Sequence, residues 1–162
     1  MRRSPLPFAL PGILGSALLL VACAAAPSGG GASAPTPDPA TARVRLESHR
    51  WELVYWEGRT VPHGDNGEPV ILSFKDGRVS GHAGCNRMNA GFELGPEPGA
   101  LRVSQGMLTR MACEPGRMEF EAAFVKALTA STRYQFDGDR LRLSQSASLP
   151  ALEFHKRELQ GE

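Results

Sequence analysis

Two cysteines in the second half of the sequence are the residues best suited to chemistry. Cys85 lies in the stretch Ser80–Arg87, and Cys113 lies in the stretch Leu108–Glu114. Each stretch follows a strand-like run, so only folding can bring the two side chains together. The pair is compatible with a structural disulfide, with two buried thiols, with part of a metal site or with a catalytic thiol.

The positions of the histidines weaken the metal and catalytic interpretations. A catalytic thiol needs a base and an orienting group, and the chain offers His82 near Cys85 and the distant His49, His63 and His155. A zinc site needs more ligands than this, and the sequence has neither a C-x-x-C motif nor a second histidine at matching spacing. We therefore expect no metal, no cofactor and no enzymatic activity.

Polar residues beside the two cysteines form a candidate recognition patch. They are Asn86, Arg87, Asn89, Thr109 and Arg110. In one interpretation these side chains satisfy backbone groups in tight loops, as buried loops require. In the other they recognise a peptide, a glycan or a component of a cell envelope. We favour the first interpretation and keep the second open.

Most of the elements that must position these residues have strand patterns. Trp51–Trp56 and Val70–Phe74 are rich in aromatic and β-branched residues, and Asp76-Gly77 after the second run predicts a hairpin. A second hairpin is predicted over Tyr134–Leu143, where apolar and polar residues alternate on both sides of Asp137-Gly138. Gly81 and Gly84 allow a sharp turn before Cys85.

One helix is expected after the second cysteine. Pro115 suits a helix start, and the residues after it form an apolar stripe. The stripe consists of Phe120, Phe124, Ala127 and Leu128. Together the patterns predict a mainly β (α+β) fold, with a curled or partly closed antiparallel sheet of about seven short strands packed on one helix.

Several motifs in this order resemble the META domain, also called the HslJ-like domain. They are Phe74-x-Asp76-Gly77-Arg78, Gly84-Cys85-Asn86-Arg87 and Thr109-Arg110-Met111-Ala112-Cys113. The resemblance covers residues 45–157 and implies an antiparallel β fold, related in outline to small barrels, with a helix. It also implies an association with bacterial envelope lipoproteins, the heat-shock response and tolerance of certain antibiotics. No catalytic activity is established for that family.

The start of the sequence has the features of an export signal. An apolar run from Phe8 to Ala22 follows Arg2 and Arg3, and it ends in Leu20-Val21-Ala22-Cys23. This end resembles the bacterial lipobox, which implies cleavage before Cys23 and acylation of that residue. An ordinary signal peptide cleaved near Ala24 is the alternative. Because Ala24 and not aspartate follows the cysteine, the resemblance implies an outer-membrane anchor facing the periplasm.

The segment after Cys23 is predicted to be a flexible tether. Residues 23–44 are mostly Ala, Pro, Ser, Gly and Thr, which bury too little apolar surface to offset the entropy of ordering. The expected organisation is therefore a signal peptide over residues 1–22, a tether over residues 23–44 and the domain over residues 45–157.

The net charge and the expected location limit the kinds of binding partner. Removal of residues 1–22 leaves 16 basic and 17 acidic side chains without a basic cluster, so nucleic acid is not expected as a partner. The expected partners are the membrane, through the lipid, and an envelope protein or small ligand. An exported chain whose third cysteine is acylated also favours a disulfide between Cys85 and Cys113.

We therefore expect a membrane-tethered, non-catalytic binding or stress-protective module. A thiol-dependent enzyme and a chaperone-like factor in outer-membrane assembly are the alternatives.

Overall fold

The structure is a computed structural model that describes residues 35–56, 58–63, 68–146 and 151–159. All of them belong to one structural unit, residues 33–162. The helices are α1 (Pro39–Glu47) and α2 (Pro115–Ala130). The strands are β1 (Arg50–Trp56), β2 (Ile71–Lys75), β3 (Arg78–His82), β4 (Arg87–Leu94), β5 (Leu101–Val103), β6 (Met107–Leu108), β7 (Arg133–Asp137), β8 (Arg140–Ser144) and β9 (Leu152–Arg157).

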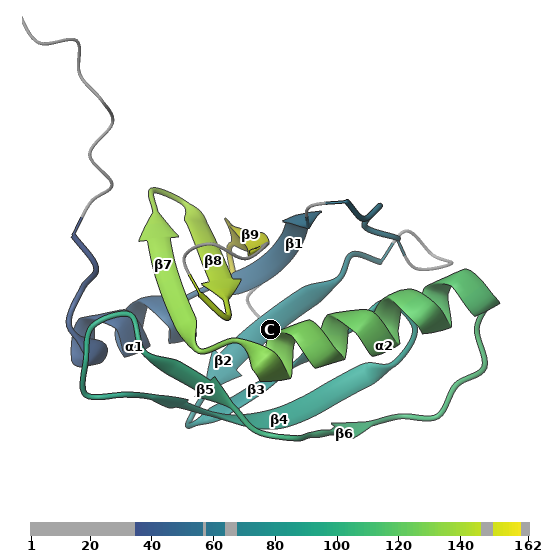
Figure 1. The fold of residues 1–162 in the computed structure, drawn as a ribbon, viewed down its shortest axis with the longest axis horizontal. Coiled ribbons are helices and arrows are strands. Elements are labelled where there is room, and N and C mark those ends of the chain that lie inside the picture. The colour runs from purple at the N-terminus through teal and green to yellow at the C-terminus, as the bar shows by residue number, and fades with distance from the viewer. Residues whose placement is uncertain (1–34, 57, 64–67, 147–150, 160–162) are drawn as a thin grey trace, which may run out of the picture. The chain divides into compact units, whose positions relative to one another are not determined.

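The strands form a single antiparallel sheet that nearly closes on itself (Figure 1). Their order is β5-β4-β3-β2-β1-β9-β8-β7, and β6 pairs with β4 beyond the end of β5. The two ends of the sheet meet where Ala100 bridges Arg133 and where Tyr134 N donates to Gly99 O at 2.8 Å. This arrangement confirms the predicted curled, partly closed antiparallel sheet.

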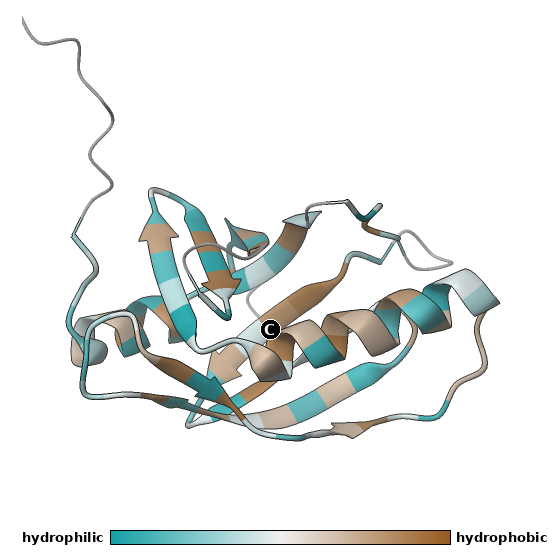
Figure 2. Ribbon diagram, viewed as in Figure 1, coloured by the Kyte–Doolittle hydropathy of each residue, from teal (hydrophilic) through white to brown (hydrophobic). Residues whose placement is uncertain are grey.

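The core lies between the inner face of the sheet and α2, which crosses it in Figure 1. The predicted stripe buries Phe120, Phe124 and Leu128, and Figure 2 shows apolar residues recurring along this helix and along the strands. The Phe124 and Phe154 rings lie 6.4 Å apart between centroids, and those of Phe120 and Trp56 lie 5.7 Å apart. Aromatic edge contacts of this kind add to the free energy of burial.

A helix replaces the last part of the predicted tether. Residues 39–44 belong to α1, so the prediction of a flexible segment through residue 44 is wrong there, while residues 23–34 lie outside the described residues. Asp38 caps the helix by accepting from the Ala40 and Thr41 N–H groups. Hydrogen bonding from the Thr41 side chain, and then from these backbone groups, lowers the pKa of its carboxyl group. Ala42 and Leu46 are completely buried.

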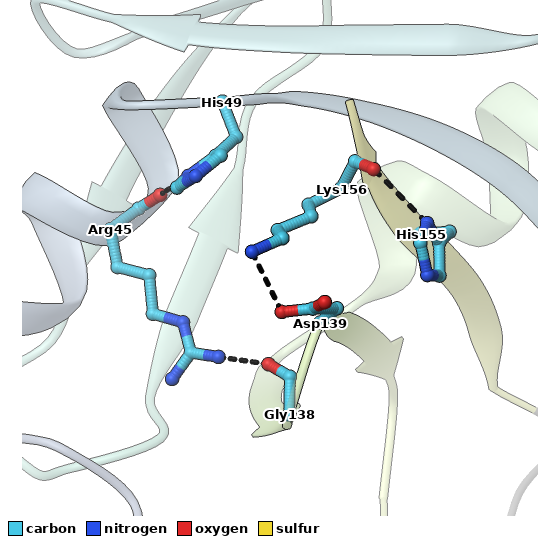
Figure 3. A network of polar contacts seen from close by, with 6 residues as sticks. All are labelled: Arg45, His49, Gly138, Asp139, His155 and Lys156. Carbon is cyan, nitrogen blue, oxygen red and sulfur yellow. Dashed lines mark hydrogen bonds and ion pairs between the residues drawn. The ribbon is translucent and has the colours of Figure 1, made fainter. Parts of the chain in front are cut away.

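Polar contacts join α1 to the β7–β8 hairpin (Figure 3). Arg45 donates to the Gly138 carbonyl in the β7–β8 turn, and its guanidinium lies 4.4 Å from the centroid of Phe136. In the same turn Asp139 pairs with Lys156 Nζ at 2.8 Å, and the hydrogen bond from Lys156 lowers the pKa of Asp139. The helix is therefore an integral part of the domain.

Two elements, β6 and α1, were not expected from sequence. The short strand β6 follows β5 closely and pairs through Met88↔Leu108 and Asn89↔Met107, so the described residues contain nine strands where about seven were predicted. The helix α1 likewise makes two helices where one was predicted. Both are short, and their sequences have little periodicity of their own, so the contacts with the rest of the domain stabilise them.

Truncation of the α1 contact should measure how much this helix contributes. Leu46→Ala removes a completely buried side chain, so we expect the free energy of unfolding to fall by about 2–5 kcal/mol. Val44→Ala on the same helix is the control, because Val44 is 67% exposed and its loss should change stability by less than about 0.5 kcal/mol. Urea denaturation measures both values. Equal effects of the two variants would contradict the packing of α1 on the core.

Candidate functional site

A disulfide joins the loop between β3 and β4 to the segment that leads into α2. The Cα atoms of Cys85 and Cys113 are 6.0 Å apart, and 28 positions separate them in sequence. Cys85 is almost completely buried. Neither sulfur is a free thiol, so the pair contributes to structure in the form that an oxidising compartment favours.

The carboxylate of Glu121 on α2 binds the same loop from inside. Its Oε2 atom accepts hydrogen bonds from the backbone N–H groups of Cys85 and Asn86, and its Oε1 atom accepts one from Asn86 Nδ2 at 2.9 Å. Glu121 is only 7% exposed, and a buried carboxylate is tolerated only where such donors surround it.

Sequence analysis did not identify Glu121 as part of the site. The signal was present in the helical spacing, because Glu121 precedes Phe124 by three residues and Leu128 by seven, and so it lies beside the apolar stripe. An acidic residue at such a position is buried with the stripe and must have partners across the interface.

Asn86 connects three segments and has no polar group left for a ligand. Its side-chain oxygen accepts from Thr109 Oγ1 at 2.8 Å and from Met111 N at 2.7 Å, while its amide donates to Glu121. It is 5% exposed. This member of the candidate patch thus satisfies neighbouring groups in the manner of the first interpretation.

Two glycines let this loop approach its neighbours closely. Gly84 has φ of +114°, and a Cβ atom there would lie 3.1 Å from the Phe120 ring of α2. Its carbonyl accepts from Arg117 Nε at 3.0 Å. Gly81 lies within β3 and not in the turn, and a Cβ atom there would lie 1.8 Å from the Ile71 carbonyl oxygen. Its role is close strand contact, in contrast to the predicted turn.

A hollow of about 560 Å³ lies beside this loop, on the outer face of β2, β3 and β4. Because Leu72, Phe74 and Val79 face the core, the alternate residues Ser73 and Ser80 face outward. Both serines line the hollow.

Strand register places these lining residues in rows across the sheet. One row runs from Arg50 on β1 through Ser73 and Ser80 to Asn89 and Met107. The next row runs from Ile71 through His82 to Arg87. His82 and Arg87 are the residues at the two ends of the loop that the disulfide holds.

The structure divides the remaining candidate patch. Arg87, Asn89 and Thr109 line the hollow, whereas Arg110 is exposed and does not. Asn89 accepts a hydrogen bond from Arg78 Nε at 2.7 Å, and Thr109 Oγ1 accepts from Arg87 N at 3.1 Å. The guanidinium of Arg87 has no hydrogen-bond or ion-pair partner among the described residues.

His82 is a mostly buried residue of the lining of this hollow. It is 8% exposed, and its Nδ1 atom is the only buried side-chain nitrogen or oxygen of the described residues without a hydrogen-bond partner. A buried polar atom in this condition costs free energy, and such atoms are rare in folded proteins. The hollow is therefore the candidate site.

Two other kinds of site are not found in the part of the chain that the structure describes. No group of three or more histidine, cysteine, aspartate or glutamate residues there is arranged to hold a metal ion. None of the described helices is long and apolar enough to cross a membrane.

Glu121→Gln tests the buried carboxylate. The substitution replaces one acceptor oxygen with an NH₂ group that must face N–H donors, so we expect the free energy of unfolding to fall by about 1–3 kcal/mol. Glu119→Gln is the matched control, because Glu119 is exposed on the same helix and should change stability by less than about 0.5 kcal/mol. Chemical denaturation measures both. A wild-type stability for Glu121→Gln would show that the carboxylate does not hold the loop.

Reduction tests the disulfide. We expect the free energy of unfolding to fall by about 3–4 kcal/mol for a loop of this length, while the apolar core keeps the domain folded. Thermal unfolding with and without reductant measures the change, and the double variant Cys85→Ser/Cys113→Ser should match the reduced protein. Two free thiols per chain, counted in denatured and unreduced protein, would be inconsistent with the bond.

Three solved structures are similar to this domain. An NMR structure of a protein from Burkholderia xenovorans is 27% identical, with a TM-score of 0.61, and the match covers 82% of this chain and 97% of that one. A second NMR structure is 23% identical with a TM-score of 0.55, covering 70% and 92% of the two chains. A crystal structure of a DUF4847 family protein from Bacteroides vulgatus is 15% identical, with a TM-score of 0.54 and coverage of 74% and 99%. The last two, at these identities, show likeness of fold alone.

No curated protein matches the sequence. The model of the META domain matches residues 44–158, which agrees with the resemblance over residues 45–157 found from the motifs and covers more than half of the 162 residues. The chain therefore belongs to the META domain family.

Proposed function

We propose that this protein is an envelope lipoprotein, anchored through Cys23, whose META domain is a non-catalytic binding module with a stress-protective role. The anchor places the domain at the outer membrane facing the periplasm. The domain then binds an envelope protein or a small ligand near the membrane surface. The stress-protective part of the proposal rests on the family resemblance.

The observation that carries the proposal is the disulfide between Cys85 and Cys113 in a chain that begins with a lipobox-like run. Disulfides persist in exported proteins and are rare in the reducing cytosol. Sequence and structure thus favour the same compartment on independent grounds. A lipid-anchored domain in that compartment meets its partners at high local concentration along the membrane.

The binding role is supported by the hollow outside β2–β4. It offers arginine, hydroxyl and imidazole groups next to a loop that the disulfide holds in place. The disulfide also occupies both cysteine sulfurs of the domain, which removes the nucleophile that a thiol-dependent enzyme would need. A binding module is therefore favoured over the enzyme. A chaperone-like factor is the alternative.

The lipid anchor is tested by intact-mass measurement of protein purified from membranes. We expect a chain that starts at Cys23 and carries the added mass of acyl groups. Cys23→Ala should abolish that added mass, because it removes the only residue on which the proposed acylation acts. Cys113→Ser is the control, and it should leave both acylation and membrane association unchanged. A wild-type chain without acyl mass would overturn the anchor.

A further inference from the structure

We propose that the hollow outside β2–β4 binds a small molecule that joins one anionic head group, a carboxylate or a phosphate, to a short apolar body. This inference deepens the binding role proposed above and rests on it. The evidence comes from the charges, hydroxyl groups and apolar side chains around the hollow.

The two arginines that line the hollow make no polar contact with other described side chains or backbone groups through their guanidinium groups. Among the described residues, neither the Arg50 nor the Arg87 guanidinium has a hydrogen-bond or ion-pair partner. Other arginines of the sheet do have partners: Arg157 pairs with Glu52, and Arg142 with Glu153 at 3.2 Å. A guanidinium binds carboxylate and phosphate oxygens through paired N–H groups, so free arginines in a hollow favour an anionic ligand.

The lining also limits how much negative charge the ligand can carry. Glu68 lines the hollow together with the two arginines, so these three charged side chains sum to +1. A single anionic head group complements that charge. A long polyanion such as nucleic acid would meet the Glu68 carboxylate and is disfavoured.

The register places the arginines on opposite sides of a floor of small hydroxyl side chains. Arg50 on β1 and Arg87 on β4 are separated by the two intervening strands, which contribute Ser73 and Ser80. No hydrogen bond of either serine side chain is found within the described residues, so both hydroxyls can donate to an anion. His82 lies on the same strand as Ser80, two residues further on, and adds an imidazole.

Apolar side chains bound the hollow on the β6 side. Met107 is 72% exposed and Leu108 is 38% exposed, and both line the hollow with the buried Ile71. Exposed Met and Leu side chains gain free energy when a ligand covers them, and methionine adapts its shape to its partner. These side chains suit the apolar body of the ligand.

The site is held in its shape before any ligand arrives. The Asn86 and Thr109 side chains hydrogen-bond each other at 2.8 Å, and Thr109 N donates to Arg87 O at 3.0 Å, so β4 and the segment after β6 are locked together. The disulfide fixes the loop between His82 and Arg87. Preorganisation of this kind lowers the entropic cost of binding.

The test uses three probes with six carbon atoms each: hexanoate, hexyl phosphate and the neutral hexanamide. The protein is the full chain with Cys23→Ala, which removes the acylation site, and binding is followed by NMR of the backbone amides. We expect at least one of the anionic probes to shift signals of residues 80–82, 87–89 and 107–109, and hexanamide to leave them in place. Shifts with hexanoate alone identify a carboxylate ligand, and shifts with hexyl phosphate alone identify a phosphate ligand.

Charge variants locate the binding. Arg87→Gln and Arg50→Gln should each weaken binding of the anionic probe by about tenfold or more, because each removes charged hydrogen bonds. Arg110→Gln is the matched control, since Arg110 lies near the loop but outside the hollow, and it should change affinity less than about twofold. If Arg87→Gln loses the dispersed spectrum of a folded protein, Arg50→Gln on a different strand decides the question.

Three results would overturn the inference: no shift with either anion, equal shifts with hexanamide, or equal weakening by Arg110→Gln and Arg87→Gln. None of them affects the acylation of Cys23, so the anchored binding module would stand with another kind of ligand. Conversely, anion binding by a chain that is not acylated in cells would leave this inference intact and overturn the anchor.

Discussion

The hydrogen bonds between the Glu121 carboxylate and the β3–β4 loop are the interaction on which the rest of the site depends. A carboxylate that is 7% exposed has lost its hydration, and the loop supplies two backbone N–H groups and one side-chain amide in its place. The same contact satisfies loop N–H groups that the turn leaves without a strand partner. Loss of either partner within the folded domain would therefore leave buried polar groups of the other unsatisfied.

The disulfide and Asn86 extend this constraint from the core to the outer surface. Glu121 bonds the loop from the helix side. The disulfide from Cys85 to Cys113 joins the loop to the segment before α2. Asn86 bonds the same segment at Thr109 and Met111. Because every tie leads to the same short turn, the strands on either side of it are fixed in register. The backbone positions of the residues that line the hollow on the outer face are therefore fixed by contacts in the core.

Closure of the sheet and packing of α1 are separate from the contacts around the β3–β4 loop. The sheet is closed where Ala100 bridges Arg133, and α1 packs Leu46 on the core while Trp51 Nε1 donates to the Leu46 carbonyl at 3.0 Å. Regular structure of the domain is therefore present before β1, in α1. Helix α1 is therefore part of the folded domain, because its buried side chains pack on the core and Arg45 bonds the β7–β8 turn.

The sequence by itself determined the local elements and the family. Alternation and Asp-Gly turns placed the hairpins, helical spacing placed the α2 stripe, and the spaced cysteine motifs identified the META domain, because these signals depend only on neighbours along the chain. The tertiary structure decided which polar residues are free. In the sequence, Asn86, Arg87 and Arg110 were equal candidates for the recognition patch. In the structure, the Asn86 side chain is hydrogen-bonded to Glu121 and Thr109. Arg87 lines the hollow, and Arg110 lies outside it. Helix α1 and strand β6 also make contacts with distant segments, α1 with Gly138 and β6 with β4. Such outcomes depend on pairings across many residues, which no local pattern encodes.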